Sequence, residues 1–242
     1  MKTFTDEDVT RCKALALAAT GRPNVEQITI FFTDEEPVFL VRPLTAAEYG
    51  EHLDAFIRVS EDADAALLVD VILWPSQAEV ARIAGDHPAL AAKFGMEFRR
   101  IMGVLPELNA PLVPLSKATP AQLERAGLSA TTAAELLTAG GRPHLLVLRG
   151  ISPRAGGADV ALVLRTPSAS LYGAHADRMA AVGKAGKGLL GLAVQTVTDV
   201  CAWSREPLTV YLDTLPGIFA ADLTSAFLAL GGAGARTERK RL

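Results

Sequence analysis

The chain has 242 residues, of which 50% are hydrophobic and 21% are charged, and its net charge is −3. These values exclude a disordered chain, allow one large domain or two small ones, and argue against general nucleic-acid binding. No apolar run approaches the roughly 20 residues of a membrane span, and residues 1–8 lack the apolar stretch of a secretory signal.

Charge divides the chain into unlike halves. Residues 1–103 contain 17 acidic and 10 basic side chains, a net of −7, whereas residues 104–242 contain 10 and 14, a net of +4. An acidic half joined to a basic half favours docking of unlike halves, within one chain or between chains.

The first third of the chain predicts a helix, a hairpin and a second helix. Apolar residues recur near helical spacing over 6–19, where Thr5 or Asp6 can cap the helix, and β-branched and aromatic residues over 26–32 and 38–42 predict two strands joined by a turn. Thr45 with Glu48 three residues later forms a capping box, which predicts a helix that reaches about residue 59.

Helices dominate the expectation for the rest of the first half. An acidic link over 61–64 leads to an apolar helix over 65–73, which Trp74-Pro75-Ser76 breaks. Further helices are predicted from Ser76 to about residue 84 and over 87–103. Four prolines within 104–120 predict an extended connector, because proline lacks an amide donor and fixes its own backbone.

The second half repeats the first. Tyr49-Gly50-x-His52-x-Asp54 returns 123 residues later, and the tryptophan and phenylalanine that follow return after 129. Small loop insertions in a duplicated unit would produce this growing offset.

We therefore expect an α+β fold of two homologous units in tandem, each a β-hairpin with a packed helical bundle. The predicted segments are 1–103 for the first unit, 104–120 for the connector, 121–235 for the second unit and 236–242 for a basic tail. The matched residues are Tyr49, His52, Asp54, Trp74 and Phe98, and Tyr172, His175, Asp177, Trp203 and Phe227.

These matched residues invite a metal or acid–base interpretation, which helix geometry opposes. His and Asp two positions apart point to different sides of a helix and do not converge on one ion. We therefore expect Tyr and His to pack under the hairpin, the tryptophans to anchor the core, and no catalytic, cofactor or metal site. Lining of a junction between the units, and ligand stacking by a tryptophan, remain as alternatives.

Three other features could indicate a functional site but are better explained without one: residues 183–188, the two cysteines and the basic tail. Residues 183–188, Gly-Lys-Ala-Gly-Lys-Gly, lack the spacing and the Ser or Thr of a phosphate loop, which leaves a flexible basic loop that could touch an acidic partner. Two cysteines, Cys12 and Cys201, predict reduced thiols of a cytosolic protein, and nothing local supports a Cys–His catalytic pair. The basic tail is expected to be a solvated end, with contact to nucleic acid or an acidic surface as the sharper alternative.

One unit has a pattern of residue classes typical of a known family. The strand that ends in Val41-Arg42-Pro43-Leu44-Thr45 leads into a charged helix, an apolar helix and Trp74-Pro75, and the unit closes with residues 98–103, Phe-Arg-Arg-Ile-Met-Gly. This resembles the small tail assembly chaperones of tailed bacteriophages and the chaperone or hub-associated proteins of contractile-tail baseplates. The resemblance covers about residues 38–103 and, more weakly, 160–232. Family members usually carry one unit, and their hairpin and first helix are simpler.

The resemblance implies a role in building a phage tail or a tail-like injection machine. The family binds through surfaces, so it transfers no site residue. The expected partners are tube, baseplate or tape-measure proteins, with a homotrimer of six similar faces as the expected oligomer and no membrane or nucleic acid. Such a protein would act in the cytoplasm during assembly, with retention in the finished particle as the alternative. The alternatives are an enzyme or small-ligand binder with a pocket between the repeats, and a DNA-binding regulator that uses the tail.

Overall fold

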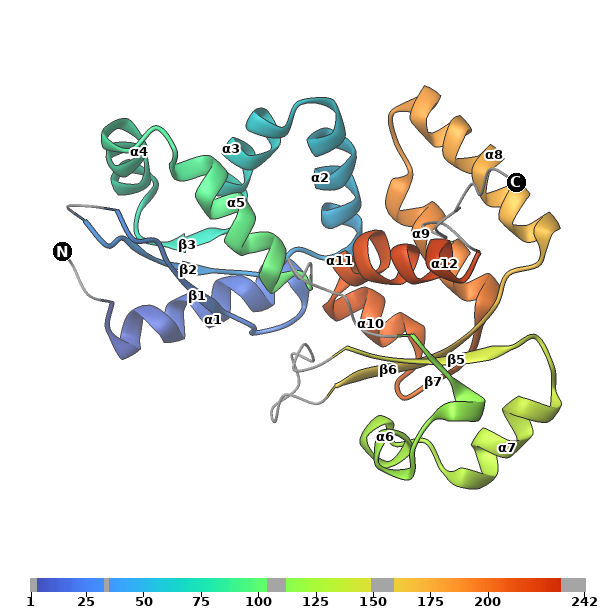
Figure 1. Cartoon of the computed structure of the whole chain (residues 1–242). Coiled ribbons are helices and arrows are strands. Elements are labelled where there is room, and N and C mark those ends of the chain that lie inside the picture. Colours follow the sequence, from blue (N-terminus) through green and yellow to red (C-terminus); the bar gives the residue numbers. More distant parts are fainter. Residues whose placement is uncertain (1–3, 33–34, 104–111, 149–158, 232–242) are drawn as a thin grey trace, which may run out of the picture. The chain divides into compact units, whose positions relative to one another are not determined.

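The computed structural model describes residues 4–32, 35–103, 112–148 and 159–231. The chain folds as two compact α+β units, residues 1–106 and 107–242, and each is described here by itself (Figure 1). Among the described residues, no helix is both long enough and apolar enough to cross a lipid bilayer.

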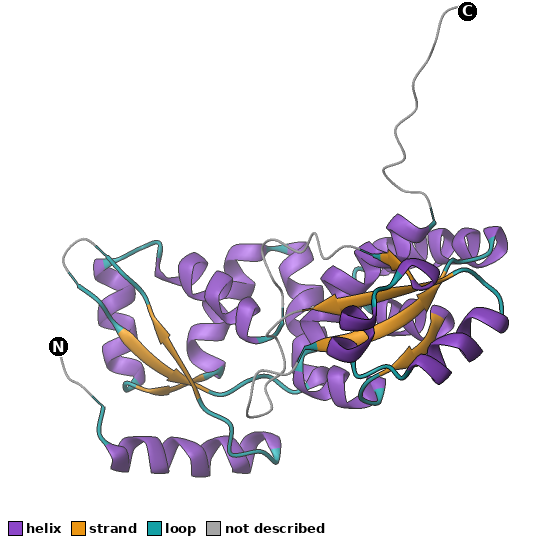
Figure 2. Ribbon diagram, turned by 60° about the horizontal axis from the view of Figure 1, so that its bottom comes forward, coloured by secondary structure: helices purple, strands orange, loops and turns teal. Residues whose placement is uncertain are grey.

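The first unit combines a small antiparallel sheet with five helices among its described residues. In chain order its elements are α1 (Asp6–Thr20), β1 (Glu26–Thr29), β2 (Val38–Val41), α2 (Ala46–Arg58), α3 (Ser60–Asp70), β3 (Ile72–Trp74), α4 (Gln77–Asp86) and α5 (Leu90–Ile101). The strand order is β1-β2-β3, and both pairs are antiparallel. Helix α1 lies on one side of this sheet, while α3 and α5 lie on the other (Figures 1 and 2).

Capping residues and aromatic packing explain why this unit takes these bounds. Thr5 and Thr45 begin α1 and α2 with complete capping boxes, and Gly21, with φ of 71°, ends α1 in the left-handed conformation that glycine tolerates. The core between the sheet and α5 contains Phe39 and Phe94, whose rings meet edge to face with centroids 5.6 Å apart. Burial of these rings fixes the face that α5 turns to the sheet.

The second unit has a larger sheet and more helical segments. Its elements are β4 (Val113–Pro114), η1 (Leu115–Lys117), α6 (Pro120–Ala126), α7 (Ala130–Thr138), β5 (Pro143–Leu148), β6 (Val160–Arg165), α8 (Ala169–Ala185), α9 (Leu189–Val200), β7 (Cys201–Ser204), α10 (Leu208–Thr214), α11 (Pro216–Ile218), the π-helical turn η2 (Phe219–Leu223) and α12 (Thr224–Leu230). The strand order is β4-β5-β6-β7, antiparallel throughout.

Strand β6 lies at the centre of the second unit. Its residues 160–164 are all buried, so neither face of the strand is open to solvent. Ala161 and Val163 belong to a core shared with η1, α6 and α7. Figure 1 shows α6 and α7 on one side of the sheet and α9 and α12 on the other, which is why a strand without alternating polarity fits here.

Both sheets contain an irregularity in the pairing of their last strand. In the first unit the register of β2 and β3 shifts between Leu40 and Val41, and in the second the register of β6 and β7 shifts between Val163 and Leu164. A bulge bends and twists the strand that carries it. Each shift lies between the two residues that precede an arginine, Arg42 directly after β2 and Arg165 at the end of β6.

The structure differs from the sequence prediction at several elements. Residues 61–64 are the first turn of α3 rather than a link, and the predicted helix over 65–73 ends at Asp70, after which β3 follows. Residues 113–117, expected within the connector, form β4 and η1, and β4 pairs with β5. Gly183 and Lys184, expected in a loop, belong to α8. Residues 104–111, residues 149–158 and the basic tail lie outside the described residues.

Candidate functional site

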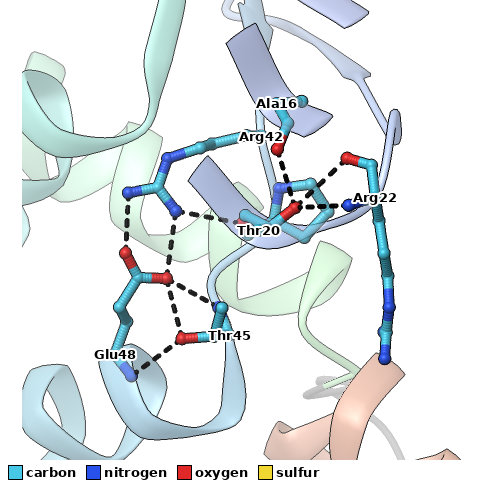
Figure 3. A network of polar contacts seen from close by, with 7 residues as sticks. Ala16, Thr20, Arg22, Arg42, Thr45 and Glu48 are labelled. Carbon is cyan, nitrogen blue, oxygen red and sulfur yellow. Dashed lines mark hydrogen bonds and ion pairs between the residues drawn. The ribbon is translucent and has the colours of Figure 1, made fainter. Parts of the chain in front are cut away.

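The start of α2 carries a dense polar network in the first unit (Figure 3). The guanidinium of Arg42 donates to both carboxylate oxygens of Glu48, at 2.8 and 3.0 Å, and Glu48 also accepts from the amide and hydroxyl of Thr45, at 2.8 and 2.9 Å. Arg42 directly follows β2 and Thr45 caps α2, so one carboxylate joins the end of the strand to the helix. A bidentate pair of this kind fixes direction as well as distance.

The Arg42 side chain is largely buried, so its ion pair with Glu48 serves to hold the fold together. The Arg42 side chain is only 10% exposed, and that of Glu48 is 36% exposed. Burial by itself raises the pKa of the Glu48 carboxyl, but the hydrogen bonds from Arg42 and Thr45 outweigh it and leave the pKa below its usual value. Glu48 therefore remains ionised opposite Arg42.

A second, local network in Figure 3 closes the end of α1. The hydroxyl of Thr20 donates to the carbonyl of Ala16 at 2.9 Å, lies 3.1 Å from the carbonyl of Arg22, and accepts from the Arg22 amide at 3.3 Å. These bonds satisfy main-chain groups at a helix end. They stabilise the turn that leads from α1 into β1.

His52 lies one turn beyond the first network, between aromatic rings. Its ring centroid is 6.3 Å from that of Tyr49 and 6.1 Å from that of Phe56. Its Nε2 atom is buried and has no hydrogen-bond partner among the described residues. Burial lowers the pKa of His52, which the nearby Asp64 carboxylate partly opposes. His52 is therefore a half-buried imidazole that packs between aromatic rings at the edge of the core.

Asp64 and Arg99 form a buried ion pair between α3 and α5. The Asp64 side chain is 7% exposed and accepts from Arg99 at 2.5 Å, and the Arg99 guanidinium also lies over the Phe56 ring, 4.4 Å from its centroid. An ideal Cβ on Gly95 would lie 2.2 Å from a carboxylate oxygen of Asp64. The absence of a side chain at Gly95 is what allows Asp64 to enter the helix interface.

Among the pockets of the first unit, two have several charged side chains in their lining. One, of about 390 Å³, lies beside α2 and α3, where Arg42, Glu48, Glu51, His52 and Asp70 contribute its polar lining. The other has a volume of about 330 Å³ and is lined by polar and apolar residues, among them Arg11, Glu35, Trp74, Ser76 and Glu79. No group of three or more His, Cys, Asp or Glu side chains that could hold a metal ion is found in the part of the chain that the structure describes.

The second unit places its matched histidine in an aromatic and hydroxyl environment. His175 is 5% exposed, its Nδ1 lies 2.9 Å from the hydroxyl of Thr196, and its ring centroid is 4.8 Å from that of Phe227. The Thr196 hydroxyl donates to the carbonyl of Leu192, so it can accept from an Nδ1–H. Burial, and secondarily the charge of Arg178, lower the pKa of His175.

Arg165 is the residue of the second unit that corresponds in sequence to Arg42, but its surroundings differ. Ser168 caps α8 by accepting from the Leu171 amide at 3.1 Å, with backbone angles close to those of Thr45. Leu171 occupies the position that Glu48 has in the first unit, and it brings no carboxylate. The Nε atom of Arg165 is buried without a hydrogen-bond partner among the described residues.

Asp222, in the π-helical turn η2, is a second group whose position in the second unit is unusual. Its Oδ2 atom is buried and lacks a partner within the described part of the chain, and burial raises the pKa of its carboxyl to about 7. Phe219 and Leu223 at the two ends of the turn are fully buried. The carboxyl therefore lies at the margin of an apolar core.

The structure buries four of the ten matched residues, two in each unit, and leaves the other six partly or fully exposed. Tyr49 and Phe98 are buried in the first unit, and Phe227 is buried and stacked on Tyr172 in the second, with ring centroids 5.7 Å apart. Asp177 is exposed on α8, and Asp54 is partly exposed on α2. Trp74 and Trp203, expected to anchor the core at helix ends, instead lie on β3 and β7 and are partly exposed.

Some polar groups of interest were not expected from sequence. Asp64 and Arg99 are 35 positions apart, and sequence spacing alone carries no signal for their pairing. Asp222 lies in a stretch with no motif. One difference between the two units can be detected in the sequence. When Tyr49 is aligned with Tyr172, Glu48 is matched by Leu171, so the second unit lacks the carboxylate that pairs with the arginine in the first.

Both cysteines are free thiols. Cys12 is buried on α1 in the first unit, and Cys201 is half-buried on β7 in the second. Burial raises the pKa of both thiols. Such environments are typical of inert rather than nucleophilic cysteines.

Comparisons of this chain with protein-family models, with characterised proteins and with solved structures found no match.

Proposed function

We propose that this chain is a non-enzymatic assembly protein of a phage tail or contractile tail-like machine, built from two copies of one α+β unit. The observation that carries the duplication is the position of the two bulges. Each lies between the two residues that precede an arginine, at Leu40–Val41 before Arg42 and at Val163–Leu164 before Arg165, and these positions are 123 residues apart like the two tyrosines.

Further correspondences support two copies of one unit. Leu40 pairs with Trp74 in one sheet, and Val163 pairs with Trp203 in the other. Each arginine leads to a hydroxyl-capped helix with the same tyrosine and histidine, followed by a second helix and the strand that carries the tryptophan. Independent evolution of so many matched positions would require repeated coincidence, whereas duplication explains them together.

The assembly role is supported by the resemblance of residues 38–103 to tail assembly chaperones. The residues that carry this resemblance include Arg42 and Thr45, and they form the strand-to-helix junction of Figure 3. In this proposal the first unit presents its surface to tube, baseplate or tape-measure proteins during assembly in the cytoplasm. Three chains with two like units each would present six similar faces to a ring.

The distribution of charge refines this picture. The described part of the second unit contains eight acidic and eight basic side chains, so the basic excess of the second half belongs to residues outside the described ranges. The first unit, by contrast, is acidic over its length. The first unit therefore carries a net negative charge, whereas the described part of the second unit is neutral. In this proposal a partner would recognise the acidic first unit, and attraction between two oppositely charged folded halves is not required.

Co-expression with the tube, baseplate and tape-measure proteins encoded beside it tests this function. We expect a stable complex with one of them, with a defined mass by native mass spectrometry. A neighbourhood without tail genes, together with a monomer that binds none of these proteins, would contradict the assembly role. An experimental structure in which residues 26–103 and 143–231 do not superpose would contradict the duplication separately.

A further inference from the structure

We propose that the outer edge of β1 binds an extended, apolar and positively charged segment of a protein partner as an additional strand. The inference uses the correspondence between the two units proposed above, because the second unit supplies its reference. It goes beyond the assembly role, because it names the edge that binds and the conformation of the segment that is bound.

Strand β1 lies at the edge of the first sheet, whose strand order is β1-β2-β3. Ile30 donates its amide to the carbonyl of Pro37 at 3.0 Å, which continues the ladder between β1 and β2 beyond Thr29. Bonded residues alternate along an antiparallel strand, so the main-chain groups of Gln27, Thr29 and Phe31 point away from β2. Within the described part of the chain, no hydrogen bond reaches these main-chain groups.

The second unit has a strand on the equivalent edge. Gln27 pairs with Leu40, and Leu145 pairs with Val163, the residue of β6 that corresponds to Leu40. On its other side Leu145 pairs with Val113 of β4, so an extended segment already lies along β5. Among the described residues, no strand takes that place along β1.

The free edge lacks the features that usually prevent the addition of a strand. Residues 26–32, Glu-Gln-Ile-Thr-Ile-Phe-Phe, contain neither proline nor lysine, and Phe31 is 66% exposed. A pocket of about 320 Å³ is lined by residues 27–29 of β1 together with Glu97 and Arg100 of α5, so α5 does not cover the whole of this strand.

The surroundings of the edge indicate which segment it prefers. Main-chain groups recognise an extended backbone of any sequence, so side chains and charge decide the preference. The β4 segment, Val113–Pro114, is apolar, and the exposed Phe31 offers an apolar contact to a similar segment. Residues 1–103 carry a net charge of −7, which attracts a basic segment and repels the first unit of a second copy. An apolar, basic strand from another protein is therefore the occupant that we assign.

Amide hydrogen exchange in the full-length protein tests whether the edge is free. The amides of Gln27 and Thr29 should exchange fast, whereas those of Ile28 and Ile30, which donate to β2, and of Leu145, which β4 covers, should exchange slowly. Slow exchange of Gln27 and Thr29 in the protein alone overturns the proposal. If that protection rises with protein concentration, a second copy occupies the edge, and if it does not, another part of the same chain does.

The peptide acetyl-Lys-Val-Thr-Val-Thr-Val-Lys-amide is the probe for binding. It should slow the exchange of Gln27 and Thr29 by about tenfold when its concentration is about ten times its dissociation constant. The exchange of Leu145 should not change, because that edge is already paired. Two control peptides should protect the edge less, one with prolines in place of the valines and one with glutamates in place of the lysines.

Two substitutions of Thr29 provide the matched protein controls. Thr29→Pro removes an amide that points outward and leaves the bonds from Ile28 and Ile30 to β2 in place. It should weaken binding of the peptide by about tenfold, which corresponds to about 1.4 kcal/mol. Thr29→Val keeps the amide and should bind like the wild type.

The proposal is refuted if the peptide leaves Gln27 and Thr29 unprotected, if either control peptide protects them equally, or if Thr29→Pro binds as tightly as Thr29→Val. Slow exchange of Ile28 and Leu145 shows that each variant is folded. None of these outcomes depends on tube, baseplate or tape-measure proteins, so failure of the edge to bind and failure of the assembly role can be told apart.

Discussion

The carboxylate of Asp64 occupies the space that a side chain at Gly95 would fill. An ideal Cβ on Gly95 would lie 2.2 Å from Oδ1 and 2.4 Å from Cγ of Asp64. Helices α3 and α5 therefore approach closely where an acidic residue enters their interface. The pairing with Arg99 neutralises the charge that this approach buries.

Gly95→Ala tests this close approach. We expect a loss of about 1–3 kcal/mol in the free energy of unfolding, because the new methyl group must displace Asp64 or separate the helices. Gly85→Ala in α4 is the matched control, since no atom lies within 4 Å of its ideal Cβ, and it should be neutral or stabilise by about 0.5–1 kcal/mol. Urea denaturation measures both, and equal effects would contradict the packing.

Glu48→Leu should destabilise the first unit. The substitution leaves the buried Arg42 guanidinium without its carboxylate and removes half of a capping box, a combined loss of about 1–3 kcal/mol. Glu48→Gln retains an acceptor for the Thr45 amide and should cost less. Thermal unfolding ranks the three proteins, and a Gln variant as unstable as the Leu variant would show that the charge alone matters.

Asp222→Asn should stabilise the protein at alkaline pH. Burial raises the pKa of Asp222 from 3.8 to about 7, so its contribution to stability is fully present below 3.8 and is lost as pH rises through about 7. The amide cannot ionise, so the variant should be more stable than the wild type at pH 8 and equal to it near pH 4. Urea denaturation at both values decides, and a constant difference would contradict the assignment.

His175 should give the opposite pH dependence. Burial lowers its pKa below 6.5, so the unfolded chain takes up a proton first, and the stability present above pH 6.5 falls as pH decreases toward the lower folded pKa. His175→Gln removes this titration and should flatten the profile between pH 7 and 5. Parallel profiles for variant and wild type, from the same denaturation series, would count against a buried neutral imidazole.

Local signals in the sequence predicted much of the fold. Thr45 with Glu48, and Ser76 alone, mark helix starts that the structure confirms. Strand β6, Val160–Arg165, is an almost continuous apolar run, a signal that can be recognised in sequence without knowledge of its partner strands. An α+β protein was expected and is found.

Elements that depend on distant partners could not be predicted in this way. Strand β3 has three residues, and only its pairing with β2 distinguishes it from the end of an apolar helix. The acidic residues 61–64 were interpreted as a solvated link, yet they suit the positive N-terminal end of α3, and Asp64 turns inward to Arg99. In both segments, contacts with residues distant in sequence determine the local structure.

The burial of Cys12 and Cys201 gives the unmodified protein two natural probes of its own opening. A thiol reagent reacts with the thiolate, so labelling of the buried Cys12 must wait until its surroundings loosen, and labelling of the half-buried Cys201 should speed up when its surroundings loosen. Because one lies on α1 and the other on β7, in different units, two labelling rates followed along a denaturant series would reveal whether the halves open together or one after the other.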